Sequence, residues 1–386
     1  MFKKLIFWEA IAAIVGTIIG AGVFVLPHTA VKAGLSTSLI WLFFLGLAIT
    51  YIHLLFGEIV LRTKNEYRLP GYVGHYLGQP AKKFLLITNF LTFAISLLIY
   101  LILGAKFLSI LFKGLNLLEF FWVLVLWLIS TIVILFDNKL VGKVNFYLSF
   151  ALIGLFIVLS IYCLPHIQNV NFNLPTASNS NWLIPYGIFF YALIGISAIP
   201  EAIQLAKGKI SGKNIKKIIL IGSLVPVAIY FLFILSTIGA VGARISQEAI
   251  ISLSVVLGPN IAIIGALVGL LAVVTSYLIF GHYLKNSFIH DYRWPKWLVY
   301  VVIALCPILA YFFLSGKMDL ITLISFIGAL VSGFEGIMIL FVARQAKKEG
   351  DREPEYKLPL PKPIFWFLAG CFVAGAISQI IIFVNN

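Results

Sequence analysis

Charged side chains are scarce in this sequence. Of its 386 residues only 11% are Asp, Glu, Lys or Arg, whereas 61% are hydrophobic and the mean hydropathy is +1.06. No water-soluble domain could bury so much apolar surface. The composition therefore excludes a soluble globular protein. It predicts an all-α polytopic membrane protein in which residues 1–386 form a single transmembrane domain.

The sequence also lacks the patterns of several kinds of active site. Its three cysteines, Cys163, Cys306 and Cys371, lie apart in apolar surroundings, without the spacing of a disulfide or a metal site. Its six histidines show no metal-ligand spacing, and no GxxxxGKS or GxxxxGKT phosphate-binding loop is present. We therefore expect inert packing cysteines and no enzymatic activity, metal centre or bound cofactor.

Eleven apolar segments are long enough to cross a bilayer, which takes about 20 residues per helical crossing. Their limits are near residues 6–31, 35–61, 84–112, 119–136, 143–164, 182–206, 217–243, 259–284, 296–314, 319–343 and 363–384. Most of the 28 lysines and arginines precede the first segment or follow an even-numbered one. The positive-inside rule then places the amino terminus in the cytoplasm and the carboxyl terminus outside the cytoplasmic membrane. The net charge of +14 is thus attributed to membrane orientation, with no nucleic-acid partner, and the polar stretch 344–362 to a solvated cytoplasmic linker.

The first apolar segment carries Gly16, Gly20 and Gly22 in its middle. Each glycine weakens a helix by roughly 1 kcal/mol relative to alanine, and unwound backbone is tolerated at membrane depth only where it lines a cavity. Two interpretations are open. The helix is broken at mid-membrane, so that its unpaired N–H groups hold an anion and its unpaired carbonyls a cation, or it is unbroken and Gly16 and Gly20 form a GxxxG packing face.

The sixth segment carries a second interruption between Tyr191 and Glu201, where Pro200 removes a backbone donor and blocks the preceding turn. The two interruptions are centred near residues 20 and 197, and the same offset carries the end of the fifth segment close to the end of the tenth. This spacing favours two repeats of five helices, residues 6–164 and 182–343, each opening with a broken helix. An odd number of crossings makes the repeats inverted, and 363–384 is an extra helix.

At these positions the sequence resembles a known family. The run Gly16-Thr-Ile-Ile-Gly-Ala-Gly-Val-Phe-Val-Leu-Pro27 resembles the first-helix signature of the amino acid, polyamine and organocation (APC) superfamily of permeases. The closest resemblance is to its amino acid/auxin and its aromatic and hydroxy amino acid permease branches, on the runs Val141-Gly-Lys-Val-Asn145, Ala198-Ile-Pro-Glu201 and Val274-Thr-Ser-Tyr-Leu278. The resemblance covers the first ten helices. It implies a five-plus-five inverted repeat with helices 1 and 6 broken, and a secondary active transporter that moves a neutral amino acid by alternating access, driven by a Na⁺ or H⁺ gradient.

The resemblance also implies where substrate and cation would bind. The substrate carboxylate would lie against the first interruption and its ammonium group against the second; the implied residues are Thr17, Ile18, Gly20, Ala21, Gly22, Tyr191, Gly195 and Ser197. The Ala-x-x-Thr-Ser run of the eighth segment matches that of sodium symporters of this fold; the implied Na⁺ ligands are Gly16, Ile19, Ala272, Thr275 and Ser276. The alternative is that the two hydroxyls only bond their own helix backbone, and proton-coupled relatives carry the same pair.

Acidic side chains within the membrane also need an explanation, since each costs roughly 2.5–3.5 kcal/mol at a helix centre. Glu201 follows the proline of the second interruption and is the candidate for proton coupling; the alternative is a cap for the following half-helix. Glu9, Glu58 and Glu335 lie nearer the predicted cytoplasmic ends. We expect them to pair with Lys or Arg in a cytoplasmic gate.

Aromatic residues offer a weak indication of the substrate. Residues that could line its pocket are Phe93, Ser96, Phe189, Phe190, Tyr191 and Phe326, which favour an apolar or aromatic amino acid, although lipid-facing packing is the alternative for the aromatic rings. Two other functions stay open: a channel or non-transporting membrane subunit, and a metal-ion transporter on the same fold. The second is disfavoured because the interruptions offer no Asp, Met or His cluster.

Overall fold

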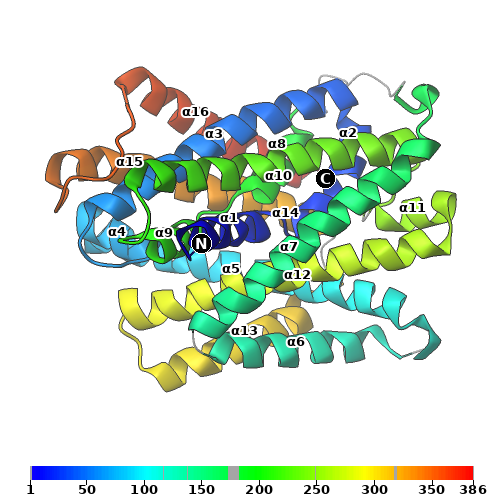
Figure 1. Cartoon of the computed structure of the whole chain (residues 1–386), viewed down its shortest axis with the longest axis horizontal. Coiled ribbons are helices and arrows are strands. Elements are labelled where there is room, and N and C mark those ends of the chain that lie inside the picture. Colours follow the sequence, from blue (N-terminus) through cyan, green and yellow to red (C-terminus); the bar gives the residue numbers. More distant parts are fainter. Residues whose placement is uncertain are drawn as a thin grey trace.

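The computed structural model describes residues 2–115, 117–136, 138–172, 182–247, 249–316 and 320–385. Over these residues every regular element is a helix (Figure 1). The elements of the amino-terminal half are α1 (Phe2–Ile18), η1 (Ala21–Val25), α2 (Leu26–Ala33), α3 (Leu35–Arg62), α4 (Leu69–Leu77), α5 (Gln79–Leu111), η2 (Lys113–Leu115), α6 (Glu119–Leu135), α7 (Asn138–Cys163), η3 (Leu164–His166) and η4 (Asn169–Phe172).

The carboxyl-terminal half is also helical. Its elements are α8 (Ile184–Leu193), α9 (Ala198–Ala206), α10 (Gly212–Val241), α11 (Ile250–Leu257), α12 (Pro259–Asn286), the π-helix η5 (Ser287–Asp291), α13 (Lys296–Leu314), α14 (Leu320–Phe326), the π-helix η6 (Ile327–Ser332), α15 (Gly333–Glu349) and α16 (Lys362–Asn385).

Many of these helices have the length and composition of membrane spans. Among the described residues nine helical stretches are long and apolar enough to cross a bilayer, and the bent pair of α1 with η1 and α2 would be a tenth. Helix α6 is apolar but has only 17 residues. The predicted class, an all-helical polytopic membrane protein, is therefore confirmed. The count of eleven crossings and the two inverted repeats, 6–164 and 182–343, remain predictions.

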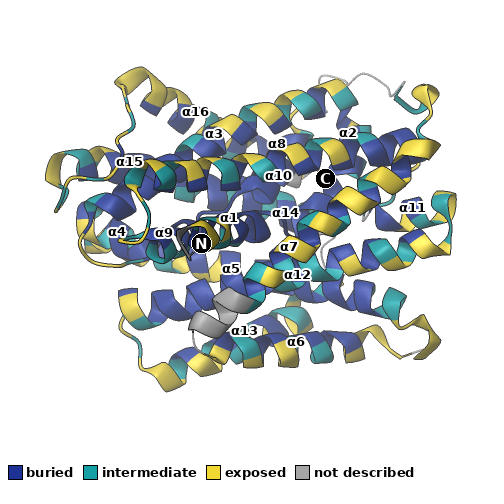
Figure 2. Ribbon diagram, in the orientation of Figure 1, coloured by how far each residue is buried: buried dark blue, intermediate teal, exposed yellow. Residues whose placement is uncertain are grey.

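Burial separates the inner helices from the outer ones (Figure 2). The apolar stretch Ile184–Ala206, which contains α8 and α9, is 83% buried, whereas the stretch Lys296–Leu314, α13, is only 22% buried. α1 packs against α7, α9 and α10, and α12 packs along α5 and α7. Because the stretches with the two predicted interruptions are inside the bundle, any binding site at these interruptions is enclosed by protein rather than by lipid.

The connection between α15 and α16 differs from its prediction. α15 continues to Glu349, so the first residues of the expected linker are helical. The connection then lies beside α4 (Figure 1) and is tied to α3: Arg352 N donates to Arg62 O at 3.1 Å, and Tyr356 Oη donates to Leu54 O at 2.6 Å. We therefore describe it as a strap bound to α3 and not as a freely solvated linker, although Glu353 is exposed in it.

Candidate functional site

The first interruption follows the end of α1 at Ile18. Gly20 has extended backbone angles, with φ −118° and ψ −151°, and the helical segments on either side of it meet at a bend of 48°. Glycine is needed here because of close approach, since a Cβ on Gly20 would lie 2.6 Å from Ser276 Oγ, and one on Gly22 would lie 2.9 Å from Ala192 Cα. The glycines therefore bring α12 and α8 against the unwound backbone.

The second interruption separates α8 from α9. α8 ends at Leu193, Ile194 is extended with φ −72° and ψ 129°, and α9 begins at Ala198. A Cβ on Gly195 would lie 2.4 Å from Ile18 Cγ1. The two interruptions are thus in direct contact with each other inside the bundle.

Two buried side chains hold the interrupted backbone in place. The hydroxyl of Tyr230, on α10, lies 2.7 Å from Ile18 O and 2.8 Å from Ala192 O, so one phenol serves carbonyls of both interruptions. Such partners are required because an unpaired carbonyl at membrane depth costs several kcal/mol. Sequence reasoning missed Tyr230, which lies far along the chain from both carbonyls.

His53, on α3, plays a matching part at the second interruption. Gly195 N donates to His53 Nε2 at 3.0 Å, so Nε2 is an acceptor and the ring proton lies on Nδ1. That proton points to Ser223 Oγ, 2.9 Å away. The neutral imidazole therefore links α3, α10 and the unwound Gly195, and a second proton on the ring would remove the acceptor for Gly195.

A small cavity of about 10 Å³ lies between the two interruptions. It contains five of the predicted substrate-binding residues: Thr17, Ile18, Gly20, Gly22 and Tyr191. It is completed by four residues that were not predicted: Tyr100, Ala192, Ile194 and Phe280. Three further candidates, Ala21, Gly195 and Ser197, lie outside its lining. The cavity therefore brings together most of the predicted site, which two distant parts of the sequence contribute.

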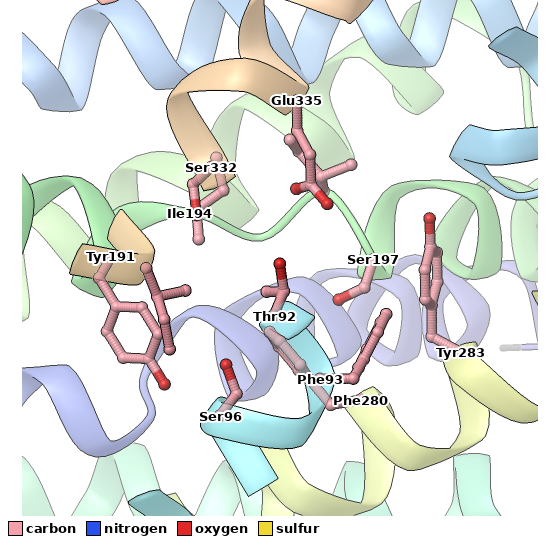
Figure 3. Close-up of a pocket in the computed structure, with 12 residues that line it drawn as sticks. Thr92, Phe93, Ser96, Tyr191, Ile194, Ser197, Phe280, Tyr283, Ser332 and Glu335 are labelled. Atoms are coloured by element: carbon pink, nitrogen blue, oxygen red, sulfur yellow. The ribbon is translucent and has the colours of Figure 1, made fainter. Parts of the chain in front are cut away.

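A second small cavity, of about 30 Å³, shares Tyr191, Ile194 and Phe280 with the first (Figure 3). Its other lining residues are Thr92, Phe93, Ser96, Ile196, Ser197, Tyr283, Ile327, Ser332 and Glu335. Of the predicted pocket residues, Phe93 and Ser96 thus lie in this second cavity. Phe189 and Phe190 are fully buried in the packing of α8, and Phe326 ends α14 outside both linings.

The predicted cation ligands lie on α1, the residue after it, and α12. Thr275 Oγ1 donates to its own helix, at 2.9 Å to Leu271 O and 3.0 Å to Ala272 O, as the alternative interpretation expects. The hydroxyl of Ser276 makes no hydrogen bond of normal geometry and lies beside Gly20. Gly16 instead faces α7, where its Cβ would overlap Ser149 Oγ. Ile19 is fully buried.

The acidic candidates have different surroundings. Glu58, 2% exposed, accepts from Arg62 at 2.9 Å, from Lys347 at 2.7 and 2.8 Å, and from Leu358 N at 2.9 Å, as expected of a residue paired with cytoplasmic cations. Glu201 forms an ion pair with Arg68, a residue from the connection between α3 and α4.

Glu335 and Glu9 differ from that expectation. Within the described part of the chain neither has a cation within ion-pair distance, and Glu335 lines the second cavity instead. Its position depends on how α15 packs against α5 and η6, which no local sequence pattern shows.

Arg68 is the centre of a polar layer at the end of the bundle that carries α4. Its backbone N–H lies 3.2 Å from both carboxylate oxygens of Asp291, and the adjacent Leu69 N donates to Tyr283 Oη at 3.0 Å. Burial alone would lower the pKa of the Arg68 guanidinium, but the carboxylates of Glu201 and Asp291 raise it. Arg68 therefore stays charged and joins α9, η5 and α12.

The comparisons with known proteins agree with this geometry. Residues 3–379 match the tryptophan/tyrosine permease family. The chain belongs to this family. It is thus an integral membrane permease and not an enzyme, and the resemblance to amino acid permeases is confirmed.

Individual relatives of this permease are distant. It is 22% identical over 236 residues to "Glutamine transporter 2" of Aliivibrio fischeri, a match that covers 59% of this chain and 60% of that protein. Its fold is similar to that of MhsT in complex with L-phenylalanine, with a TM-score of 0.67 at 15% identity over 97% of both chains. It is equally similar to Mhp1, a nucleobase-cation-symport-1 family transporter in a closed conformation with bromovinylhydantoin bound, at 0.67 and 14% identity over 97% of this chain and 90% of that one. At these identities the structures show the fold alone.

Among the described residues no three His, Cys, Asp or Glu side chains come together as a metal site requires. A metal-ion transporter on this fold therefore has no candidate ligand set in that part of the permease.

Proposed function

We propose that this permease is a secondary active transporter that moves a neutral amino acid across the cytoplasmic membrane by alternating access, driven by a Na⁺ or H⁺ gradient. The amino terminus lies in the cytoplasm in this proposal and the carboxyl terminus outside. The observation that carries it is the cavity between the two interruptions, lined by Thr17, Gly20, Gly22 and Tyr191. Because the chain belongs to the tryptophan/tyrosine permease family, we expect its substrate to be an amino acid of the kind that this family transports.

The zwitterion form of an amino acid suits the interrupted backbone around this cavity. A half-helix N-terminus attracts a carboxylate and C-terminal carbonyls attract an ammonium group. The unwound stretch at Gly20 and the carboxyl end of α8, which supply these two kinds of group, line the same cavity. The rings of Tyr100 and Phe280 favour an apolar or aromatic substrate side chain.

The coupling ion has two candidate sites from the sequence. Ser276 Oγ, next to Gly20 and without a regular hydrogen bond, supports a Na⁺ site, while the bonds of Thr275 to its own helix support the alternative. Glu201 is held by Arg68, which makes it a better ion-pair partner than proton carrier. Thr275→Ala and Ser276→Ala are expected to abolish any stimulation of uptake by Na⁺.

Uptake by the purified permease in liposomes tests the proposed function. A panel of radiolabelled neutral amino acids is supplied with a Na⁺ gradient and then with a pH gradient, and we expect saturable uptake of apolar or aromatic members. Gly22→Ala should abolish uptake, because its Cβ would lie 2.9 Å from backbone on α8. Gly154→Ala on α7 is the matched control, since no atom lies within 4 Å of its Cβ. Non-saturable flux, or no flux of any amino acid, would point to a channel or a non-transporting subunit.

A further inference from the structure

The second cavity contains a carboxyl group that the proposed mechanism has not used. Glu335 stands in the first turn of α15, directly after the π-helix η6, and Figure 3 shows its carboxyl group pointing into the space between Ile194, Ser197 and Thr92. It is the one carboxylate among the described residues that line either cavity. Through Tyr191, Ile194 and Phe280 its cavity borders the proposed substrate site.

Glu335 differs from Glu58 and Glu201 because, among the described residues, no cation accompanies it. Glu58 is neutralised by Arg62 and Lys347, and Glu201 by Arg68. In the described part of the chain no Lys, Arg or His lies within ion-pair distance of Glu335. A carboxylate that is ionised, enclosed and unpaired is costly, so such a group takes up a proton or receives a cation from outside.

The titratable groups on the elements around Glu335 have other partners. On α3, His53 is held between Gly195 and Ser223. Beside α4, Arg68 binds Glu201, and on α5 Lys82 donates to the carbonyl of Asp291. Within α15 itself, Lys347 is bound to Glu58.

Two phenols and the polar wall complete the surroundings of Glu335. Tyr283, on α12, accepts from Leu69 N, and Tyr191, on α8, lines the far side of the cavity. Ser197, at the second interruption, has a buried hydroxyl without a hydrogen-bond partner in the structure. A hydroxyl in this position can donate to the ionised acid or accept from the protonated one.

We propose that Glu335 binds the proton that drives transport, in place of Glu201. This inference rests on the proposed function, and it names the coupling ion and its site. When its cavity opens to the outer solution, one O–H bond of a hydronium ion breaks, water is released, and the carboxylate gains that proton in a new O–H bond. It returns that proton to water on the cytoplasmic side.

The coupling arises from the cost of closing the cavity. The walls that approach Glu335 include the apolar side chains of Ile194, Ile196 and Ile327. Packing them around an ionised carboxylate removes its hydration without supplying a counter-charge, whereas a neutral carboxylic acid is enclosed at a much smaller cost. The closed, substrate-loaded state therefore favours protonated Glu335, and this preference links proton uptake to substrate binding.

The first test uses the purified full-length permease in liposomes that contain a trapped pH-sensitive dye. Wild type should move protons inward with its labelled amino acid and accumulate that amino acid when the interior is alkaline. Glu335→Gln should lose proton movement and accumulation entirely while it still exchanges labelled for unlabelled amino acid. Glu335→Asp should retain proton movement. Glu353→Gln, which removes an exposed carboxylate of the strap, is the matched control and should behave as wild type.

The outcomes separate this inference from the proposed function. If wild type exchanges no amino acid, the proposed function is wrong and the inference fails with it. If wild type exchanges an amino acid but Glu335→Gln still moves protons with it, or if Glu201→Gln alone stops them, only the assignment to Glu335 is overturned. Accumulation driven by Na⁺ without proton movement overturns it as well.

A second measurement needs no variant and so does not depend on folding. Dicyclohexylcarbodiimide modifies protonated carboxyl groups in apolar surroundings, and mass spectrometry locates the product. On wild type we expect modification at Glu335, reduced by the transported amino acid, and none at Glu58 or Glu201. Modification at Glu201 with none at Glu335 would overturn the proposal.

Discussion

Glu58 and Glu335 lie on two helices that pack against each other, α3 and α15, yet their carboxyl groups have opposite surroundings. Glu58 is nearly inaccessible and accepts from Arg62, Lys347 and Leu358 N, so every charge near it has a partner. Glu335 faces a cavity whose wall includes the unpartnered hydroxyl of Ser197. The paired polar groups around Glu58 hold α3, α15 and the strap together. The unpaired polar groups around the cavity, in contrast, can bind a ligand or a proton.

The largest expected effect comes from removing Glu58. Glu58→Ala leaves Lys347 and Arg62, both partly buried, without a counter-charge, and loss of one partner costs at most about 3–5 kcal/mol, the value for a fully buried pair. We expect a clear fall in the melting temperature of the detergent-solubilised permease. Glu335→Gln, the matched change in the cavity, should alter the free energy of unfolding by less than about 1 kcal/mol. Equal losses from both variants would remove the distinction between the two regions.

The partner of Glu58 sharpens the same comparison. Lys347→Met alone should destabilise the permease, and the double variant Glu58→Leu with Lys347→Met should lose less than the sum of the two single changes, because it leaves neither charge buried alone. The coupling energy from this double-mutant cycle is expected to be about 1–3 kcal/mol. A coupling energy of zero between Glu58 and Lys347 would mean that the strap, and not the ion pair, holds Glu58 in place.

An intermediate effect is expected at Tyr230, whose hydroxyl has hydrogen-bond partners at both interruptions. Tyr230→Phe leaves the carbonyls of Ile18 and Ala192 without their donor, which costs about 1–3 kcal/mol. The loss should appear as a lower melting temperature together with reduced uptake. Tyr147→Phe, at an exposed position on α7, is the control and should change neither.

The smallest effect is expected for Ser197→Ala. The buried hydroxyl has no hydrogen-bond partner in the structure, so its removal should change stability by less than about 0.5 kcal/mol. If Ser197 contacts a bound ligand or the proton site, Ser197→Ala should shift the concentration dependence or the pH dependence of amino acid uptake. A large loss of stability would instead place Ser197 among the structural residues.

Much of the fold was predictable because it depends on local composition. Long apolar stretches predicted the membrane helices, and Gly20 and Pro200 marked the two interrupted stretches, although α8 ends earlier, at Leu193, and Pro200 lies in the first turn of α9. The resemblance to amino acid permeases rested on the same residues. What remained out of reach were contacts between distant helices, such as those of Tyr230 and His53 with the interruptions, because one buried phenol or imidazole among many carries no local signal.

The sequence by itself determined that this protein is a helical membrane protein and marked two stretches where a helix break was expected, since apolar length and backbone preference act over a few residues. Only the tertiary structure decided the partners of its acidic residues. Glu58, Glu201 and Glu335 all lie in or next to apolar stretches of the chain, but the packing of α15 and the position of Arg68 give cations to two of them and a cavity to the third. Charge compensation is a property of three-dimensional neighbours, and for that reason the proposed proton site became visible only in the folded molecule.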